Sequence, residues 1–243
     1  MTIISTPDLS GRRVLIPGGT GAVGEGVVRR YLAAGAEVVV PSRSSAKAEE
    51  FRRMLGGAAT ERLHLVVHDY TTFSGAKDLV ARMRGDLGGV DDVVAPIGGW
   101  WAGKRLWEID EADWQAAFVG LATAHVAVLR AVMPVLSPQG AYTVIIGDSA
   151  TWPVPGSGLV SMEQAALLMM QRVAVAELGG EKRVFAFVLG PVATRLGHGG
   201  EVTADQVGDV AVAASASTLP GREIPLHGTA EVLQALQLLG GTR

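Results

Sequence analysis

The stretch Val14-Leu-Ile-Pro-Gly-Gly-Thr-Gly-Ala-Val-Gly-Glu-Gly26 decides the fold. Residues 14–16 form a short apolar run that predicts a buried strand, and residues 27–34 have a helical pattern. Between them, Gly18, Gly21 and Gly24 follow one another at three-residue spacing. In a dinucleotide site such glycines permit a tight turn, close approach to the pyrophosphate, and close packing of helix on strand. The strand–turn–helix context predicts nucleotide binding at the helix N-terminus. The alternative is a structural turn, because 32 glycines in 243 residues produce triplets by chance.

Composition excludes several classes of protein. Hydrophobic residues make up 48% of the chain and charged residues 19%, which is typical of a globular protein. A net charge of −3 favours neither a nucleic-acid nor an anionic-membrane partner. The chain has 0 cysteines, which excludes disulfides, thiolate metal sites and cysteine nucleophiles. No metal site, signal peptide or apolar run of about 20 residues is apparent, so we expect a cytoplasmic protein without a membrane partner.

Expected strands and helices alternate along the whole chain. The expected strands are residues 14–16, 37–40, 64–67, 90–95, 141–146, 183–189 and 223–226. The expected helices are 27–34, 46–55, 76–83, about 111–136 with a late interruption at Pro134, 161–178, 204–214 and a C-terminal helix. This alternation predicts an α/β fold: a Rossmann-type, doubly wound parallel sheet of about seven strands with helices on both faces, three layers in all. No linker or low-complexity segment divides the chain, so residues 1–243 are expected to form one domain.

The loops that follow the strands are the expected ligand-binding segments, because ligands of such sheets bind at the carboxyl ends of the strands. After the second strand comes Pro41-Ser-Arg-Ser44. An NAD site usually has Asp or Glu here, whereas Arg43 with Ser42 and Ser44 suits a 2′-phosphate. The sequence therefore favours NADP(H) over NAD(H); the alternative is a solvated arginine. Asp69 suits the adenine amino group, or equally a turn. The predicted cofactor-binding residues are Gly18, Thr20, Gly21, Val23, Gly24, Ser42, Arg43, Asp69, Tyr70, Gly98, Gly190, Val192 and Thr194.

These pieces together resemble the short-chain dehydrogenase/reductase family over nearly the whole chain. The matching segments are the glycine turn, Arg43, Asp69, the Gly98 turn, Gly190-Pro-Val-Ala-Thr194 and the late helix from Asp205. The resemblance implies that Thr194 and the backbone near Val192 hold the nicotinamide end. It also implies a homodimer or homotetramer formed through the two long helices. The glycine spacing resembles the atypical or extended branches of the family, whereas the length resembles the short one.

The chain departs from the family pattern at the positions of the catalytic residues. The family uses a tyrosine as proton donor and acceptor, with a lysine four residues later, a serine and an asparagine. Alignment on Gln164-Ala-Ala-Leu167 puts Val160 at the tyrosine position and Gln164 at the lysine position; Gly120 takes the asparagine position. None of the three tyrosines has a lysine four residues later, and no lysine falls in residues 161–178. General acid–base catalysis contributes about 10²–10⁴-fold, so another donor is needed if the protein is an enzyme.

Three residues are candidate replacements for the lost catalytic groups. Asp148 titrates upward if it is buried near a cofactor, although a solvated or capping role is an alternative. Ser149 is able to donate a hydrogen bond to a carbonyl, but it is a poor acid alone. His198 lies in a glycine-rich segment that follows Thr194 and is able to reach a substrate. His125, among apolar residues in mid-helix, is better interpreted as a packed histidine.

The five tryptophans, Trp100, Trp101, Trp107, Trp114 and Trp152, all follow the fourth and fifth strands. They suit a pocket for an apolar or aromatic small molecule, or they only pack the loops or form an interface. Three functions therefore stay open. The first is an NADP(H)-dependent oxidoreductase acting on a carbonyl or hydroxyl group through a non-standard site. The others are a non-catalytic dinucleotide sensor or inactive partner subunit, and an enzyme of the same fold with non-redox chemistry.

Overall fold

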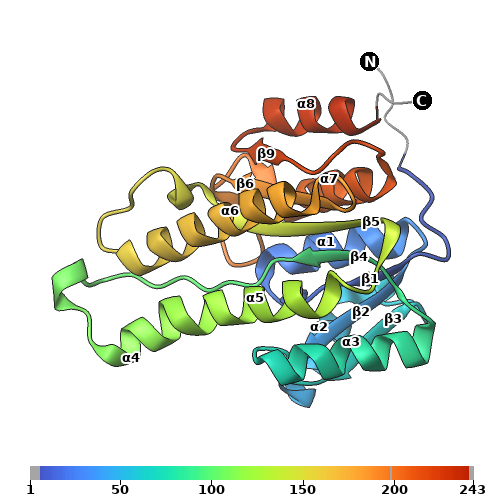
Figure 1. Ribbon diagram of the computed structural model, residues 1–243, viewed down its shortest axis with the longest axis horizontal. Helices are drawn as coiled ribbons and strands as arrows, with labels where there is room; N and C mark the ends of the chain where they lie inside the picture. The colour runs from blue at the N-terminus through green and yellow to red at the C-terminus, as the bar shows by residue number, and fades with distance from the viewer. Residues whose placement is uncertain (1–5, 198, 241–243) are drawn as a thin grey trace.

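The structure is a computed structural model that describes residues 6–197 and 199–240, and it is organised on a parallel sheet (Figure 1). The seven strands lie in the order β3-β2-β1-β4-β5-β6-β9. Their bounds are β1 Arg13–Leu15, β2 Glu37–Ser42, β3 Leu63–Val67, β4 Val90–Ala95, β5 Leu136–Gly147, β6 Arg183–Leu189 and β9 Glu223–Leu226. A separate pair is formed by β7 Val192–Ala193 and β8 Val202–Thr203. The predicted seven-stranded parallel sheet is confirmed.

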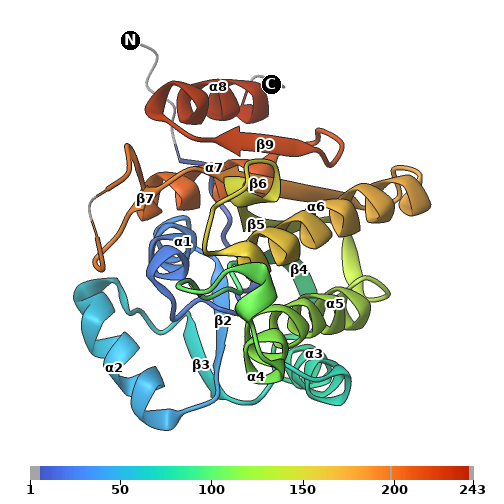
Figure 2. The same ribbon diagram turned by 90° about the vertical axis from the view of Figure 1, so that its left-hand side faces the viewer.

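Helices cover both faces of the sheet, as Figure 2 shows from the end where the strands finish. One face carries α1 Ala22–Ala33, α2 Ser45–Leu55, α7 Ala204–Ala216 and α8 Thr229–Gly240. The other carries α3 Phe73–Leu87, α5 Gly120–Val132 and α6 Gly158–Leu178. Shorter helical segments are η1 Gly56–Ala58, η2 Leu106–Glu108, α4 Glu111–Trp114, η3 Gln115–Val119 (a π-helix) and η4 Asp148–Ala150. The predicted three-layer arrangement is therefore confirmed.

Several helix predictions were wrong at their ends. The helix expected over 76–83 is α3, Phe73–Leu87, and the helix expected over 161–178 is α6, which begins at Gly158. Helix α1 begins at Ala22, not at residue 27, and includes Gly24 and Gly26. A Cβ on Gly26 would overlap the backbone of Ala204 in α7, so packing rather than helix propensity selects glycine here. The helix expected over 111–136 ends at Val132, because Pro134 lacks the N–H that a continuing helix requires and Leu136 already starts β5.

The segment Glu111–Val132 is, among the described residues, the one helical stretch long and apolar enough by length and composition to cross a membrane. Its buried residues Ala124, Ala127, Val128 and Val132 belong to the core between the sheet and α3, α5 and α6. A core helix passes the same test, and here 33% of the tested window is buried.

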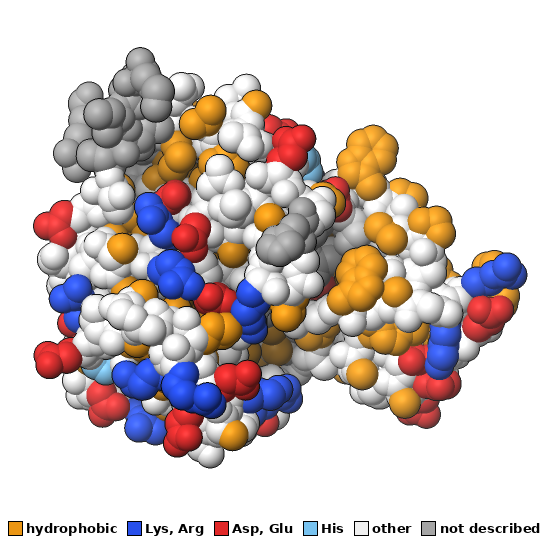
Figure 3. Space-filling model, turned by 180° about the vertical axis from the view of Figure 1, so that it is seen from behind, with side chains coloured by type: hydrophobic (Ala, Val, Ile, Leu, Met, Phe, Trp, Pro, Cys, Tyr) orange, Lys and Arg blue, Asp and Glu red, His pale blue; other side chains and the backbone are white. Residues whose placement is uncertain are grey.

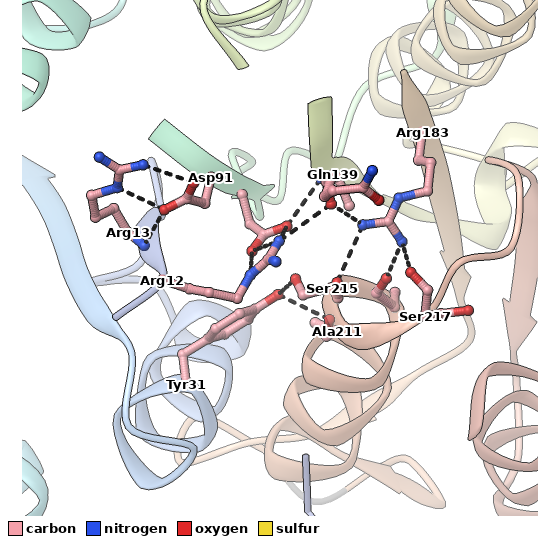
Figure 4. Close-up of polar contacts among 12 residues, drawn as sticks. Arg12, Arg13, Tyr31, Asp91, Gln139, Arg183, Ala211, Ser215 and Ser217 are labelled. Atoms are coloured by element: carbon pink, nitrogen blue, oxygen red, sulfur yellow. Dashed lines mark hydrogen bonds and ion pairs between the residues drawn. The ribbon is translucent and has the colours of Figure 1, made fainter. Parts of the chain in front are cut away.

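The amino ends of the central strands are tied together by a buried ion pair (Figure 4). Arg12 donates to the fully buried Asp92 through Nε at 2.7 Å and Nη2 at 2.8 Å, and Asp92 also accepts the Ala141 N–H at 3.0 Å. Burial raises the pKa of Asp92, while the Arg12 guanidinium opposes that rise. The pair thus links the start of β1 to β4 and β5.

A buried cation, Arg183, closes the same end of the sheet. Its guanidinium donates to four backbone carbonyls, those of Gln139, Ala214, Ser215 and Ser217. Beside it, the Tyr31 hydroxyl donates to Ala211 O at 2.9 Å and lies 2.6 Å from Ser215 Oγ. These contacts fasten α1 and α7 to the sheet, at the end opposite to the candidate site.

We predict that Arg12→Ala lowers the free energy of unfolding by about 3 kcal/mol, because it leaves the Asp92 carboxyl buried without its partner. Urea denaturation measures this loss. As a control, Arg82→Ala removes an exposed pair with Asp86 and should cost less than about 0.5 kcal/mol. Equal, small losses in the two variants would contradict this account of the sheet's amino end.

Candidate functional site

The glycine turn between β1 and α1 is built on close backbone approaches. Gly18 has φ +85°, and a Cβ on it would lie 2.5 Å from Pro96 O, in the loop after β4. A Cβ on Gly24 would lie 2.5 Å from Gly18 O. Gly18 thus supplies both the tight turn and the contact with the β4 loop, while Gly24 lets α1 pack on the turn.

The N-terminus of α1 has backbone donors available for an anion. Its N-cap, Gly21, supplies no side-chain acceptor, and the first amides, those of Ala22, Val23 and Gly24, precede the intrahelical ladder. The acidic residue of this turn, Glu25, is paired with Arg29 at 2.6 Å and with Arg195 at 3.1 Å. The helix end therefore has the donors and the dipole that a phosphate requires.

A hollow of about 400 Å³ lies beside the turn, lined by Thr20, Pro41, Ser42, Arg43, Ser44, Lys47 and Tyr70. Four of these residues, Thr20, Ser42, Arg43 and Tyr70, are predicted cofactor-binding residues. The Ser42 hydroxyl donates to Ser44 O at 3.0 Å, which shapes the turn at the end of β2. Figure 3 shows Lys and Arg side chains gathered over the part of the molecule that contains α2.

Lys47 is the hollow residue that sequence reasoning missed. It lies in the first turn of α2, whose N-cap, Ser44, accepts the Lys47 N–H through its side chain. Recognising Ser44 as a cap would have placed Lys47 one helical turn from Arg43. The hollow therefore presents two cations, on Arg43 and Lys47, and no carboxylate among its lining residues.

Asp69 follows β3 and caps its own loop. Its Oδ1 accepts the Thr71 hydroxyl at 2.7 Å and the Thr71 N–H at 3.0 Å, and these bonds lower the pKa of Asp69. The turn role, which the sequence left open, is thus present in the structure. Contact with an adenine stays a prediction.

At the carboxyl end of β5, a polar side chain of α6 reaches the backbone. The Gly147 N–H donates to Gln164 Oε1, and Gln164 Nε2 donates to Glu163 Oε2 at 2.5 Å. Val160 lies on the same buried side of α6. The Ser149 hydroxyl is close as well, since a Cβ on Gly147 would lie 3.5 Å from Ser149 Oγ and 3.7 Å from Gln164 Oε1.

Glu163 is a site residue that sequence reasoning missed. The side chain is fully buried, and burial raises its pKa to about 7 although the bond from Gln164 opposes the rise. Oε1 has no hydrogen-bond partner among the described residues. The available signal was an acidic residue on the face of α6 that also carries Val160 and Leu167.

The candidate catalytic residues differ in their burial and in their contacts. Ser149 is buried next to Gly147, and Asp148 is partly exposed with its backbone O accepting the Thr151 and Trp152 N–H groups. His198 lies outside the described residues. His125 is fully buried, with Nε2 2.8 Å from Ile97 O, and burial lowers its pKa to about 4.

The segment after β6 forms a small flap. Thr194 and Gly197 exchange backbone hydrogen bonds of 2.7 and 3.2 Å, and the Arg195–Glu25 pair ties the flap to α1. Val192 lies in β7. Gly190 packs on the end of β9, since its Cβ would lie 3.0 Å from His227 Cα, whereas Gly98 in the β4 loop has open space around it.

The tryptophans divide into two groups. Trp101 donates to Asp113 at 3.2 Å, and Trp114 stacks on Phe118 with ring centroids 4.4 Å apart, so these two pack the loop. The other three are highly exposed: Trp100 (73%), Trp107 (77%) and Trp152 (69%). Figure 3 shows large hydrophobic side chains projecting from the half of the molecule that carries these loops.

Comparison with known proteins agrees with this geometry. The family model described as "Enoyl-(Acyl carrier protein) reductase" matches residues 19–223. A short chain dehydrogenase of Pseudocercospora fijiensis is 28% identical over 187 residues, 75% of this chain and 60% of the relative. A cis-2,3-dihydrobiphenyl-2,3-diol dehydrogenase of Rhodococcus globerulus is 27% identical over 176 residues, 70% of this chain and 61% of the relative. The match thus spans about three-fifths of each relative's length.

The same fold occurs in a short chain dehydrogenase of Burkholderia cenocepacia, whose crystal structure is a complex with NADP. It superposes with a TM-score of 0.79 at 20% identity, covering 91% of this chain and 98% of that one. The chain therefore belongs to the short-chain dehydrogenase/reductase family, a family of oxidoreductases.

The buried Glu163 carboxyl predicts a pH-dependent stability. Its pKa is about 7 in the folded state and about 4.5 ordinarily, so folding takes up a proton between these values. Its contribution to stability is therefore fully present below pH 4.5 and is lost as the pH rises through 7. In Glu163→Gln this loss, at most about 3 kcal/mol, should disappear.

Urea denaturation of both proteins across this pH range measures the difference. The wild-type minus variant difference isolates Glu163 from His125, whose lowered pKa has the opposite effect because it removes stability as the pH falls. A difference that does not change with pH would contradict the assignment.

Proposed function

We propose that this protein is an NADP(H)-dependent oxidoreductase that acts on a carbonyl or hydroxyl group of a small molecule. The observation that carries the proposal is the hollow beside the glycine turn, with Arg43 and Lys47 on its wall. Two cations suit a 2′-phosphate, which is present on NADP(H) and missing from NAD(H). A family member that binds NADP has the same fold.

The α1 N-terminus suits the pyrophosphate, and the flap near Val192 and Thr194 suits the nicotinamide end. When bound, the reduced cofactor supplies a hydride. The protein's part is to orient the substrate, exclude water and place hydrogen-bond donors at the substrate oxygen. The Ser149 hydroxyl, which lies beside Gly147, suits that last task. The Gln164 amide turns its oxygen to the Gly147 N–H, so it supports the backbone at this point of the site.

The active site is non-standard in this proposal. Val160 does not donate a proton, and Gln164 does not titrate. Proton transfer to the substrate therefore depends on water or on another group, such as Asp148 or His198. A site with neither group as a proton donor favours a second candidate function. This is a dinucleotide-binding sensor, or an inactive partner subunit that binds NADP(H) without turnover. Non-redox chemistry on the same fold is the third.

An apolar or aromatic substrate is part of the proposal. Trp100, Trp107 and Trp152 follow β4 and β5 and are 69–77% exposed, so they offer ring surface to a bound molecule. The Arg105 guanidinium lies over one face of Trp107, 5.5 Å from the ring centroid. The name of the Rhodococcus globerulus relative, a dihydrobiphenyl-diol dehydrogenase, points to an aromatic-derived substrate for that protein, which supports this class here.

We also propose a cytoplasmic homodimer or homotetramer formed through α5 and α6. Apolar residues are exposed on these helices: Val126 on α5 (40%), and Met169 (53%) and Val173 (44%) on α6. Covering them in a symmetric interface would remove this apolar surface from water.

Fluorescence titration of the purified protein with NADPH and NADH tests the proposed function. We expect NADPH to bind at least about tenfold more tightly, since a hydrogen bond between charged groups contributes about 1.5–3 kcal/mol. Arg43→Ala and Lys47→Ala should each weaken NADPH binding about tenfold and leave NADH within about twofold. Lys77→Ala, which removes an exposed lysine of α3, is the control and should change neither. Equal affinities would contradict the NADP(H) assignment, and no binding of either would contradict the oxidoreductase and sensor proposals together.

The tryptophan proposal is tested by binding of an aromatic ketone to the NADPH complex. Trp107→Ala and Trp152→Ala should each raise its dissociation constant about tenfold, because each ring buries apolar area against the ligand. Phe73→Ala, which removes an exposed ring from α3, is the control. If all three variants bind the ketone as the wild type does, the tryptophans only pack the loops.

A further inference from the structure

Glu163 is an unusual group to find at the start of a core helix. The side chain has 0% exposure, yet Oε1 has no hydrogen-bond partner among the described residues. Burying a carboxyl in this way costs free energy unless the group is paired or neutral. A buried polar atom left without a partner calls for an explanation beyond packing, since a leucine would fill the same face of α6 without that cost.

The other carboxylate oxygen of Glu163 is connected to the candidate site by two hydrogen bonds. Oε2 accepts from Gln164 Nε2 at 2.5 Å, and Gln164 Oε1 accepts the Gly147 N–H. Because a backbone N–H only donates, the Gln164 oxygen must face Gly147 and its nitrogen must face Glu163. Both ends of the Gln164 amide are therefore fixed, one by the carboxyl and one by the last residue of β5.

The strength of this connection depends on the charge of Glu163. An ionised carboxylate accepts a shorter and stronger hydrogen bond from Nε2 than a neutral acid does. Ionisation of Glu163 therefore strengthens the hydrogen bond from Gln164 Nε2, and protonation weakens it. Both states are accessible near neutral pH, because burial raises the pKa of Glu163 to about 7.

No other charged group competes for Glu163 among the described residues. None of the titratable groups on α6 or on the elements packed against it makes a hydrogen bond or ion pair with Glu163; these groups are Asp148, His125, Arg130, Tyr142, Arg183, Arg172 and Glu177. The π-helix η3, which also packs on α6, has no titratable residue. Gln164 is thus the route by which this carboxyl affects its surroundings.

We infer that Glu163 is a positioning residue of the candidate site, and that its carboxyl, acting through the Gln164 amide on Gly147, couples the geometry of the site to proton uptake and release. The kinetic consequence of this inference rests on the proposed function. The contacts from Glu163 through Gln164 to Gly147 do not depend on that function. Deprotonation holds the Gln164 amide, and through it the Gly147 N–H at the end of β5, in place, and protonation releases them.

Infrared titration of the protein without cofactor tests the contact chain. The protonated-carboxyl band that is lost in Glu163→Gln should disappear with a midpoint near pH 7. In Gln164→Leu the midpoint should rise by about one pH unit, because the bond that favours the ionised form is gone. An unchanged midpoint in Gln164→Leu, or a band lost well below pH 6, would overturn the inference.

The kinetic arm uses the rate of reduction of an aromatic ketone by NADPH between pH 6 and pH 8. In the wild type this rate should rise about tenfold, as expected for one group titrating near 7. Glu163→Gln should hold it constant within about twofold, Glu163→Asp should restore a pH dependence, and Glu177→Gln, on the exposed side of α6, should match the wild type. A Glu163→Gln profile equal to that of the wild type would overturn the inference.

The two arms separate failure of this inference from failure of the proposed function. Absence of NADPH binding or turnover would count against the oxidoreductase proposal alone, and the infrared midpoints would still decide whether Glu163 acts on Gln164. Circular dichroism of each variant confirms folding, and Glu163→Gln keeps both the shape of the side chain and an acceptor for Gln164.

Discussion

The structure depends on one steric constraint: at Gly18 the chain turns so close to the β4 loop that a side chain would collide with Pro96 O. This approach brings the end of β1 against the end of β4. Gly24 extends the constraint by letting α1 pack on the same turn. The uncapped amides of α1, the hollow at the end of β2 and the loop after β4 consequently meet at one edge of the sheet. A single methyl group at Gly18 or Gly24 would push these three parts of the site away from one another. Both the fold and the site therefore require glycine at these two positions.

The two ends of the sheet have different physical roles. At the amino end, charged groups are satisfied internally: Arg12 pairs with Asp92, and Arg183 donates to four carbonyls. At the carboxyl end, within the described part of the chain, the α1 amides, Arg43 and Lys47 are open to a ligand, and the buried Oε1 of Glu163 has no partner. Internal satisfaction stabilises a fixed frame, whereas unsatisfied groups are available to a ligand.

Much of the fold was predictable because strand burial and helix periodicity are local signals. The seven strands of the parallel sheet and the glycine turn follow from these signals, and so does the meeting of Thr20, Ser42, Arg43 and Tyr70, whereas the order of the strands was not predicted. The helix ends were less predictable, since Gly24 and Gly26 are inside α1 for reasons of tertiary packing. Lys47 required the cap at Ser44 to be recognised. The Glu163–Gln164–Gly147 chain required α6 to be placed on β5, which no local pattern specifies.

The central proposal is that this family member, in whose sequence no tyrosine is followed by a lysine four residues later, uses NADPH for reduction. The most direct test incubates the protein with NADPH that carries deuterium at the transferable position of the nicotinamide, together with an aromatic ketone, and analyses the alcohol by mass spectrometry. The account predicts one deuterium on the carbinol carbon of the product, formed with multiple turnovers. Tight NADPH binding with no deuterium transferred to any ketone of an aromatic series would contradict it and leave the sensor or partner-subunit function in its place.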